Sequence, residues 1–379
     1  MVGIHTSPGT HDKLSILSTD AQYDLACACG TNDRDRRHRG GDDRWIYPVT
    51  LQNGGYCVLF KTLISNVCTN DCKYCPLRAN RDPERCTLEP EETVAAFMEY
   101  YRARKVFGIF LSSGVIGTPD ATMERLNTIA HLLRNKEKFR GYIHLKAIPG
   151  ASDAALEEAV SLSNAVSLNI ETAGEDHFKK LSSRKDYEND IIRPIKLLGD
   201  LTAKGSKWSR VKASTQFVVG ASDETDHEIV KYTWGLYKRL KFARVYFSAY
   251  QQGLGEPDLP GESLATDNRD LLTREHRLYQ VDWLMRKYGF ASVEIPFDEG
   301  GNLSLETDPK EGWAQRHPER FPVDVNRADR AELLRVPGLG PTTVDRILKR
   351  RSNGGRVNSF SDIGKPGKRL RKAAAYLKF

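Results

Sequence analysis

VCTNDCKYCP, residues 67–76, is the stretch on which the fold and the chemistry of this chain depend. It places three cysteines in C-x3-C-x2-C spacing, directly after an apolar, β-rich run at Cys57–Leu63. Iron–sulfur clusters usually take four thiolates, so a compact loop that supplies only three leaves one iron open to an exchangeable ligand. We therefore expect Cys68, Cys72 and Cys75 to hold a catalytic [4Fe–4S] cluster.

A structural zinc site is the alternative for these cysteines, because zinc prefers closed sites of four ligands that include C-x2-C pairs. Cys57 or Cys86 would then supply the fourth ligand. No second two-ligand element stands nearby in the sequence, which favours the iron–sulfur hypothesis. Together with Cys27 and Cys29 these cysteines have the right number for an auxiliary cluster, but their scattered spacing favours ordinary free thiols.

Short apolar runs alternate with longer amphipathic stretches from residue 56 onward, which is typical of βα units around a parallel sheet. The predicted strands are Cys57–Leu63, Val106–Ser112, Gly141–Ala147, Ala165–Ile170, Val211–Val219 and Ala243–Tyr250. The predicted helices between them are Pro90–Arg104, Thr122–Asn135, Ala154–Ser161, Asp190–Lys204 and Asp226–Leu240. These units predict an α/β fold, a partial (β/α)6 TIM-like barrel with its active site at the carboxyl ends of the strands.

The rest of the chain divides around this barrel. Residues 1–55 form a polar, loop-rich N-terminal extension, which contains a run of charged residues at 33–44. The barrel core spans residues 56–297 and finishes with a helix at Thr273–Tyr288 and a strand at Ala291–Pro296. A linker rich in glycine, proline and charge at residues 298–322 leads to a small all-α domain at residues 323–379.

Composition excludes some classes of protein. With 39% hydrophobic residues and no apolar run near the ~20 residues that span a bilayer, no membrane role is expected. The N-terminus lacks an export signal, and cysteine crowding suits metal binding in a reducing compartment, so we expect a cytoplasmic protein. Residues 323–379 carry 14 Lys/Arg against 5 Asp/Glu, a surplus larger than the net charge of +7 of the whole chain. This local surplus is expected of a domain that binds a phosphate backbone or, alternatively, of a solvated face.

The basic domain contains Val336-Pro337-Gly338-Leu339-Gly340 between two predicted helices. This arrangement is similar to a helix-hairpin-helix, a short module that grips the DNA backbone, and a degenerate second copy follows at residues 360–372. Amides at the glycines would face a phosphate at a helix N-terminus. Protein contacts are the alternative role of such modules. The candidate DNA-binding residues are Gly338, Gly340, Thr342, Arg346, Lys349 and Arg350.

The cysteine spacing with Tyr74 before the last cysteine, at the start of six βα units, resembles the radical S-adenosylmethionine (SAM) superfamily over about residues 56–297. The resemblance implies a [4Fe–4S] cluster whose open iron binds S-adenosyl-L-methionine. It also implies reductive cleavage of that cofactor to methionine and a 5′-deoxyadenosyl radical, with electrons from a donor such as flavodoxin or ferredoxin.

The same resemblance implies further cofactor-binding positions. Ser112, Ser113 and Gly114 stand where relatives carry a turn that contacts the methionine amino group, although the acidic side chain of that turn is absent here. Asn169 and Glu171 match a strand end that meets the ribose or methionine, with helix capping as the alternative. The resemblance also assigns Arg184 to the methionine carboxylate and Gly220 to a turn near the adenine; a solvated surface arginine is the alternative for Arg184.

Nearly the whole chain resembles a family of radical SAM proteins assigned to DNA modification or repair, whose members are often associated with a uracil-DNA-glycosylase-like partner. The resemblance implies an enzyme that abstracts hydrogen from a nucleotide extruded from duplex DNA. An RNA-modifying radical SAM enzyme and a zinc-bearing, non-enzymatic DNA-binding protein are the alternatives. The sequence does not define the target base, the fate of S-adenosylmethionine or the oligomeric state.

Overall fold

The computed structural model describes residues 8–24, 44–50, 55–263, 267–364 and 367–379. The chain splits into two compact units, which we call unit 1 and unit 2. Unit 1 comprises Met1–Glu224 with Gly235–Glu275, and unit 2 comprises Thr225–Trp234 with His276–Phe379. Among the described residues, no helix is both long and apolar enough to cross a membrane.

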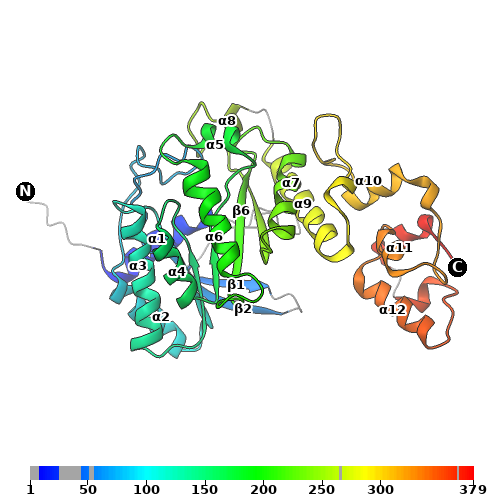
Figure 1. Cartoon of the computed structure of the whole chain (residues 1–379), viewed down its shortest axis with the longest axis horizontal. Coiled ribbons are helices and arrows are strands. Elements are labelled where there is room, and N and C mark those ends of the chain that lie inside the picture. The colour runs from blue at the N-terminus through cyan, green and yellow to red at the C-terminus, as the bar shows by residue number, and fades with distance from the viewer. Residues whose placement is uncertain (1–7, 25–43, 51–54, 264–266, 365–366) are drawn as a thin grey trace, which may run out of the picture. The chain divides into compact units, whose positions relative to one another are not determined.

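Unit 1 is built on a curled seven-stranded sheet in which the strands follow one another in chain order (Figure 1). The strands are β1 Ile46–Thr50, β2 Tyr56–Leu63, β3 Gly108–Ser112, β4 Tyr142–Lys146, β5 Ala165–Ser167, β6 Lys212–Val219 and β7 Arg244–Ala249. Strands β2 to β7 pair in parallel, which confirms the predicted partial (β/α)6 barrel. β1 adds an antiparallel edge strand to β2 that the sequence analysis missed.

Helices connect the parallel strands, and several of them lie along one face of the sheet in Figure 1. The connecting helices are α2 Pro90–Arg102, α3 Pro119–His131, α4 Asp153–Leu162, α5 Glu175–Leu181, α6 Arg193–Leu201 and α7 Asp226–Lys238. Two further helices, α8 Pro260–Ser263 and α9 Asn268–Trp283, follow β7. Helix α3 begins three residues before its predicted start, because Thr118 caps it by accepting a hydrogen bond from the amide of Ala121, and Pro119 suits the first turn.

The outer face of the sheet packs against helices, and the inner face borders a cavity. Successive side chains of a strand alternate between its two faces. In β6, Phe217 is buried in the apolar core, whereas Gln216 and Val218 line a cavity inside the barrel. The barrel interior therefore contains a cavity that could bind a ligand, and it is not filled by apolar side chains.

The segments on either side of the barrel hold two features that the sequence analysis did not predict. The loop-rich N-terminal extension contains a helix, α1 Thr10–Asp20, which buries Leu14 and Leu17. The apolar residues of this helix are few and stand among polar residues, so little in the sequence indicated it. The segment Ala291–Pro296 is not a strand but contains a 3₁₀ turn at Ser292–Glu294, where the Glu294 carboxylate accepts a hydrogen bond from the amide of Ala291. This local capping bond outweighs the β-propensity of the segment.

Unit 2 contains the C-terminal helices α10 Pro309–Arg316, α11 Arg330–Arg335, α12 Pro341–Ser352 and α13 Lys368–Lys372. A short parallel pair, β8 Val323–Asp324 and β9 Leu377–Lys378, joins the two ends of the tail. One apolar core underlies the first hairpin and the segment predicted as its second copy, since Leu339 and Ile363 belong to the same buried cluster. The segment predicted as a linker holds α10, whose Trp313 is buried.

Candidate functional site

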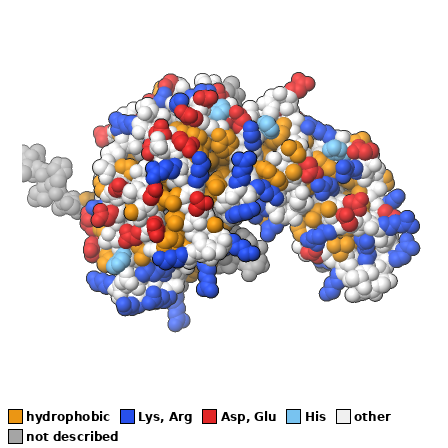
Figure 2. Space-filling view, in the orientation of Figure 1, with side chains coloured by type: hydrophobic (Ala, Val, Ile, Leu, Met, Phe, Trp, Pro, Cys, Tyr) orange, Lys and Arg blue, Asp and Glu red, His pale blue; other side chains and the backbone are white. Residues whose placement is uncertain are grey.

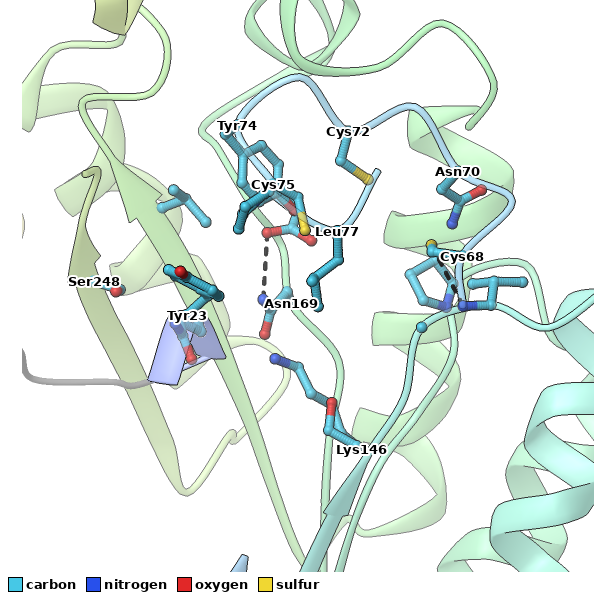
Figure 3. Close-up of a pocket in the computed structure, with 18 of the residues that line it drawn as sticks. Tyr23, Cys68, Asn70, Cys72, Tyr74, Cys75, Leu77, Lys146, Asn169 and Ser248 are labelled. Atoms are coloured by element: carbon cyan, nitrogen blue, oxygen red, sulfur yellow. Dashed lines mark hydrogen bonds between the residues drawn. The ribbon is translucent and has the colours of Figure 1, made fainter. Parts of the chain in front are cut away.

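The cysteine loop follows β2 and is pressed against the end of β3. A Cβ atom at Gly114 would lie 2.3 Å from the carbonyl oxygen of Val67, so only glycine fits this close approach. The amide of Val115 donates to Sγ of Cys68 at 3.4 Å, one of the dashed lines in Figure 3. A hydrogen bond of this kind favours the thiolate, which is the form that binds metals.

Cys68, Cys72 and Cys75 line one cavity at the carboxyl ends of the barrel strands (Figure 3). Burial raises the pKa of Cys72, and it raises the pKa of Cys75 to about 12. Free thiols here would stay protonated, and a bound cation is what favours their loss of the proton.

The donor set suits a cluster better than a single ion. Within the described ranges, no three His, Cys, Asp or Glu side chains gather closely enough to hold one metal ion. A cluster of several irons needs its thiolates further apart than one ion does. Cys68, Cys72 and Cys75 line one common cavity, which suits three thiolate ligands of a cluster.

Asp71 fixes the cysteine loop from its outer side. Its carboxylate accepts hydrogen bonds from the hydroxyl of Ser182 at 2.5 Å and from the amide of Ser183 at 2.9 Å. Burial alone would raise the pKa of Asp71, but these hydrogen bonds hold it at about 2. Arg184 adds a hydrogen bond from its guanidinium to the carbonyl oxygen of Thr69 in the same loop.

A second anchor comes from the segment after β7. The side chain of Arg78 is 3% exposed and donates to the carboxylate of Glu256 at 2.5 Å and to the carbonyl of Leu254 at 2.8 Å. Lys73 forms an ion pair with Asp258 at 2.5 Å. Both ends of the cysteine loop are therefore tied to the barrel rim, which keeps the thiols in a fixed arrangement.

Glu171 and Lys185 are charged residues of the cavity wall near the cysteines. Glu171 has φ of 68°, an uncommon backbone conformation for a non-glycine residue that often marks a functional position. It accepts a hydrogen bond from Asn169 at 3.3 Å. Burial alone would lower the pKa of Lys185, but the charges of Cys72 and Glu171 raise it above its usual value. The lysine is therefore a buried cation beside the cysteines.

Most of the cofactor-binding residues predicted from the sequence lie together in this cavity. The cavity wall includes Ser112, Ser113, Gly114, Asn169 and Glu171.

Two of the predicted positions lie elsewhere. Arg184 is not part of the cavity wall and bonds to the cysteine loop from outside. Gly220 has φ of 82° in the turn after β6, and its amide donates to the carboxylate of Glu224 at 2.9 Å. A Cβ atom at Gly220 would lie 2.7 Å from the side chain of Leu271, so the turn itself requires glycine.

The sequence analysis missed several cavity residues. Lys185, the immediate neighbour of Arg184, lines the cavity, whereas Arg184 does not; the assignment of Arg184 to the methionine carboxylate stays a prediction. Gln216 and Ser248 stand on the inner face of predicted strands, and strict alternation from the strand ends could have found them. Tyr23 belongs to a 3₁₀ turn at Ala21–Asp24, far from the barrel in sequence, and no sequence signal placed it here.

The remaining cysteines are dispersed where the structure describes them. Cys57 is half-buried in β2, and Cys86 is buried with its sulfur 3.9 Å from the carbonyl oxygen of Lys13 in α1. Cys27 and Cys29 lie outside the described residues. The auxiliary cluster on these four cysteines therefore stays untested.

A second candidate site lies at the first hairpin of unit 2, between α11 and α12. Gly338 has φ of 84°, which glycine adopts without strain. In the part of the chain that the structure describes, the amides of Gly338 and Gly340 donate no hydrogen bond. Gly340 caps α12, a helix of 12 residues whose N-terminus carries partial positive charge. Free amides at such an end form a ready site for an anion.

Helix α12 carries the remaining candidate residues of this site. Thr342 and Lys349 are exposed, and Figure 2 shows Lys and Arg side chains in blue on the visible face of the molecule. Arg346 instead donates to the carbonyl of Ile363 at 2.5 Å, and Arg350 donates to the carbonyl of Arg356 at 2.7 Å. These two guanidinium groups join the first hairpin to the segment after it.

Comparison with known proteins found two family matches. Residues 62–232 match the Radical SAM superfamily, and residues 320–374 match the helix-hairpin-helix motif. No curated protein sequence matches this chain.

Solved structures with a similar fold include methylornithine synthase, which is 15% identical with a TM-score of 0.46 over 68% of this chain and 67% of that one. The FeFe-hydrogenase maturase HydG from Carboxydothermus hydrogenoformans is 15% identical, with a TM-score of 0.45 over 58% of this chain and 50% of that one. Another HydG structure is 12% identical, with a TM-score of 0.44 over 57% and 49%. The matched part thus spans about half the length of each maturase.

The family matches agree with the cysteine cavity in unit 1 and the glycine hairpin in unit 2. The superfamily in general uses a [4Fe–4S] cluster and S-adenosylmethionine. Residues 62–232 belong to the Radical SAM superfamily, and the chain is a radical SAM enzyme that carries a helix-hairpin-helix motif in its C-terminal part.

Proposed function

We propose that this enzyme acts on DNA, in repair or base modification, through a 5′-deoxyadenosyl radical. The observation that carries the proposal is the presence in one chain of two sites. One is a cavity lined by Cys68, Cys72 and Cys75, and the other is a hairpin with free amides at Gly338 and Gly340. The first site suits a radical cofactor and the second suits the phosphate backbone of a nucleic acid.

The three cysteines would hold the cluster, and bound S-adenosylmethionine would supply a carbon radical that abstracts hydrogen. Ser112, Ser113 and Gly114 would contact the amino group of its methionine part at the end of β3. The strained Glu171, bonded to Asn169, offers polar groups to the ribose or methionine part.

Lys185 rather than Arg184 is the better partner for the methionine carboxylate. Its ammonium group is buried in the cavity wall beside Cys72, and the guanidinium of Arg184 is engaged with the outside of the loop. Cys72 and Glu171 already raise the pKa of Lys185, and its three N–H donors leave room for a ligand carboxylate as a further partner.

The nucleic-acid site would use backbone amides first and side chains second. The amides of Gly338 and Gly340, with Thr342 at the start of α12, would receive one phosphate, and the exposed Lys349 would contact its neighbour. Arg346 and Arg350 would act mainly by holding the hairpins in register. A duplex offers phosphates on both strands, which would suit the first hairpin together with the predicted second copy on the same core.

Other expectations from the resemblance stay predictions. They are an electron donor such as flavodoxin or ferredoxin and a uracil-DNA-glycosylase-like partner. The cytoplasmic location expected from the N-terminus and the cysteine content also stays a prediction.

The proposal is tested by anaerobic reconstitution with iron and sulfide, followed by dithionite reduction in the presence of S-adenosylmethionine. Chromatography then measures 5′-deoxyadenosine with duplex DNA, with structured RNA and with neither. We expect release that rises with DNA and is lost in Cys72→Ala. Cys57→Ala, which changes a cysteine outside the cavity, is the matched control and should keep the release. Stimulation by RNA alone would refute the DNA assignment and support the RNA-modifying alternative.

A further inference from the structure

The half of the cavity away from the cysteines carries polar side chains that the cofactor assignment leaves unused. Gln216 on β6 is 8% exposed and lines the cavity. Its carboxamide makes no hydrogen bond among the described residues. Because Gln216 lines the cavity, its carboxamide can bond to water or to a ligand that enters the cavity. This side chain therefore points to a polar ligand inside the barrel.

Tyr23 gives the same region an aromatic wall. In Figure 3, Tyr23 and Ser248 lie on the opposite side of the cavity from Cys68, and Lys146 extends toward Asn169. The turn that carries Tyr23 is anchored to the barrel, because the buried ammonium of Lys61 donates to the carbonyl of Ala21 at 3.3 Å.

A further bond holds the same turn at its start. Asp20, the last residue of α1, accepts a hydrogen bond from Asn66 at 2.7 Å, and its own side chain lines the cavity. The turn that carries Tyr23 is therefore held in place at two points.

Deeper in the barrel, the strands form an aromatic floor. His144 precedes Lys146 by two residues on β4, so both share the inner face, and its ring packs against Phe110 at 4.5 Å between centroids. His144 also forms a hydrogen bond with Ser167 at 3.0 Å. His144 thus has partners within this aromatic cluster, and Gln216 is the residue of the wall that can bond to a ligand.

We propose that Gln216, Tyr23 and Lys146 form a nucleobase-reading subsite in the barrel, which takes a single nucleotide extruded from the helix. The proposal rests on the DNA function proposed above. A carboxamide has a donor and an acceptor side by side, which matches the edge of a base. A tyrosine ring offers a stacking surface, and a lysine offers donors to a base carbonyl. This set recognises a planar, polar heterocycle.

The test uses duplexes that carry 5-iodouracil either as a single unpaired bulge or in a normal pair. An unpaired base is the cheapest to extrude. Fluorescence anisotropy measures duplex binding, and ultraviolet cross-linking followed by peptide mass spectrometry locates the base. We expect the bulged base to cross-link to Tyr23, and the paired base to do so far less.

Gln216→Leu should lower the Tyr23 cross-link at subsaturating protein by about tenfold, the size expected for loss of a bidentate base contact. Gln216→Glu keeps the shape but loses the donor, so it should also lower the yield and serves if the leucine variant fails to fold. Gln315→Leu, at an exposed position on α10, is the matched control and should behave like the unchanged protein.

Three results would overturn the inference. Cross-links confined to unit 2, with normal duplex binding, would leave the DNA function standing and refute the subsite. Equilibrium binding of S-adenosylmethionine that weakens tenfold in Gln216→Leu would assign the amide to the cofactor instead. Absence of duplex binding by anisotropy would overturn the proposed DNA function and the subsite together.

Discussion

Replacing Lys349 by alanine separates phosphate contact from structural support in the hairpin domain. Lys349 is exposed on α12, three residues beyond Arg346, whose guanidinium is bonded to the carbonyl of Ile363. Each phosphate neutralised by a protein contributes about 0.9 to the slope of log K against log salt. Lys349→Ala should therefore reduce that slope by about 0.9, which between roughly 50 and 200 mM salt amounts to a three- to fourfold difference in relative affinity.

Arg346→Ala should behave differently although it removes the same charge. It loses the hydrogen bond to Ile363, which costs about 1 kcal/mol for a partly exposed group, so the free energy of unfolding of unit 2 should fall. Lys349→Ala should leave that free energy unchanged.

The assay is anisotropy of a labelled duplex across the salt range, together with urea unfolding of both variants. Lys136→Ala, at an exposed position in unit 1, controls for the loss of one positive charge. An unchanged salt slope in Lys349→Ala would refute the phosphate contact. A loss of slope in Arg346→Ala with no loss of stability would show that this arginine, and not the lysine, grips the backbone.

The remaining predictions concern the cavity and the core of unit 2. Gly114→Ala should abolish cluster assembly, because its Cβ would lie 2.3 Å from the cysteine-loop backbone; iron and sulfide analysis checks this, with Gly235→Ala, which has open space, as the control. Lys185→Met should weaken equilibrium binding of S-adenosylmethionine about tenfold or more if it pairs with the carboxylate, whereas Arg184→Met should weaken it less. Burial lowers the pKa of Lys310 from 10.5 to about 7, so between these pH values the unfolded chain binds more protons and the stability of unit 2 rises with pH. Native-state hydrogen exchange of α12 measures this stability, and Lys310→Met should make its rise with pH smaller. An equally steep rise in the variant would contradict the assignment to Lys310.

The sequence predicted the barrel well because its signals are local. Each parallel strand combines an apolar run with a following helix, and the predicted strands overlap β2 to β7. The cysteine spacing also placed three cavity residues at once. The failures arose where the decisive contact is distant in sequence: α1 is buried by residues far along the chain, and Tyr23 reaches the cavity only through that packing.

Side-chain roles were harder to predict than positions. Arg184 and Lys185 are adjacent and have the same charge, and only the fold decides that Lys185 lines the cavity. Arg346 carries the pattern of a DNA-binding residue, yet its guanidinium is engaged with a carbonyl of its own domain. Composition reports the charge of a side chain, but its partner depends on tertiary structure.

Contacts between the first hairpin and the preceding segment limit how the C-terminal domain can be fused to another protein. The buried ammonium of Lys310 donates to the carbonyl of Leu339 at 2.6 Å, and Arg335 bonds to Glu294 at 2.7 Å. Trp313 packs edge-on against Phe290 at 5.4 Å. A cassette cut at residue 323 and fused to another protein would leave these underside partners behind. A working module for engineered fusions should therefore keep Phe290, Glu294 and Lys310, which lie in the C-terminal part of unit 2 ahead of residue 323.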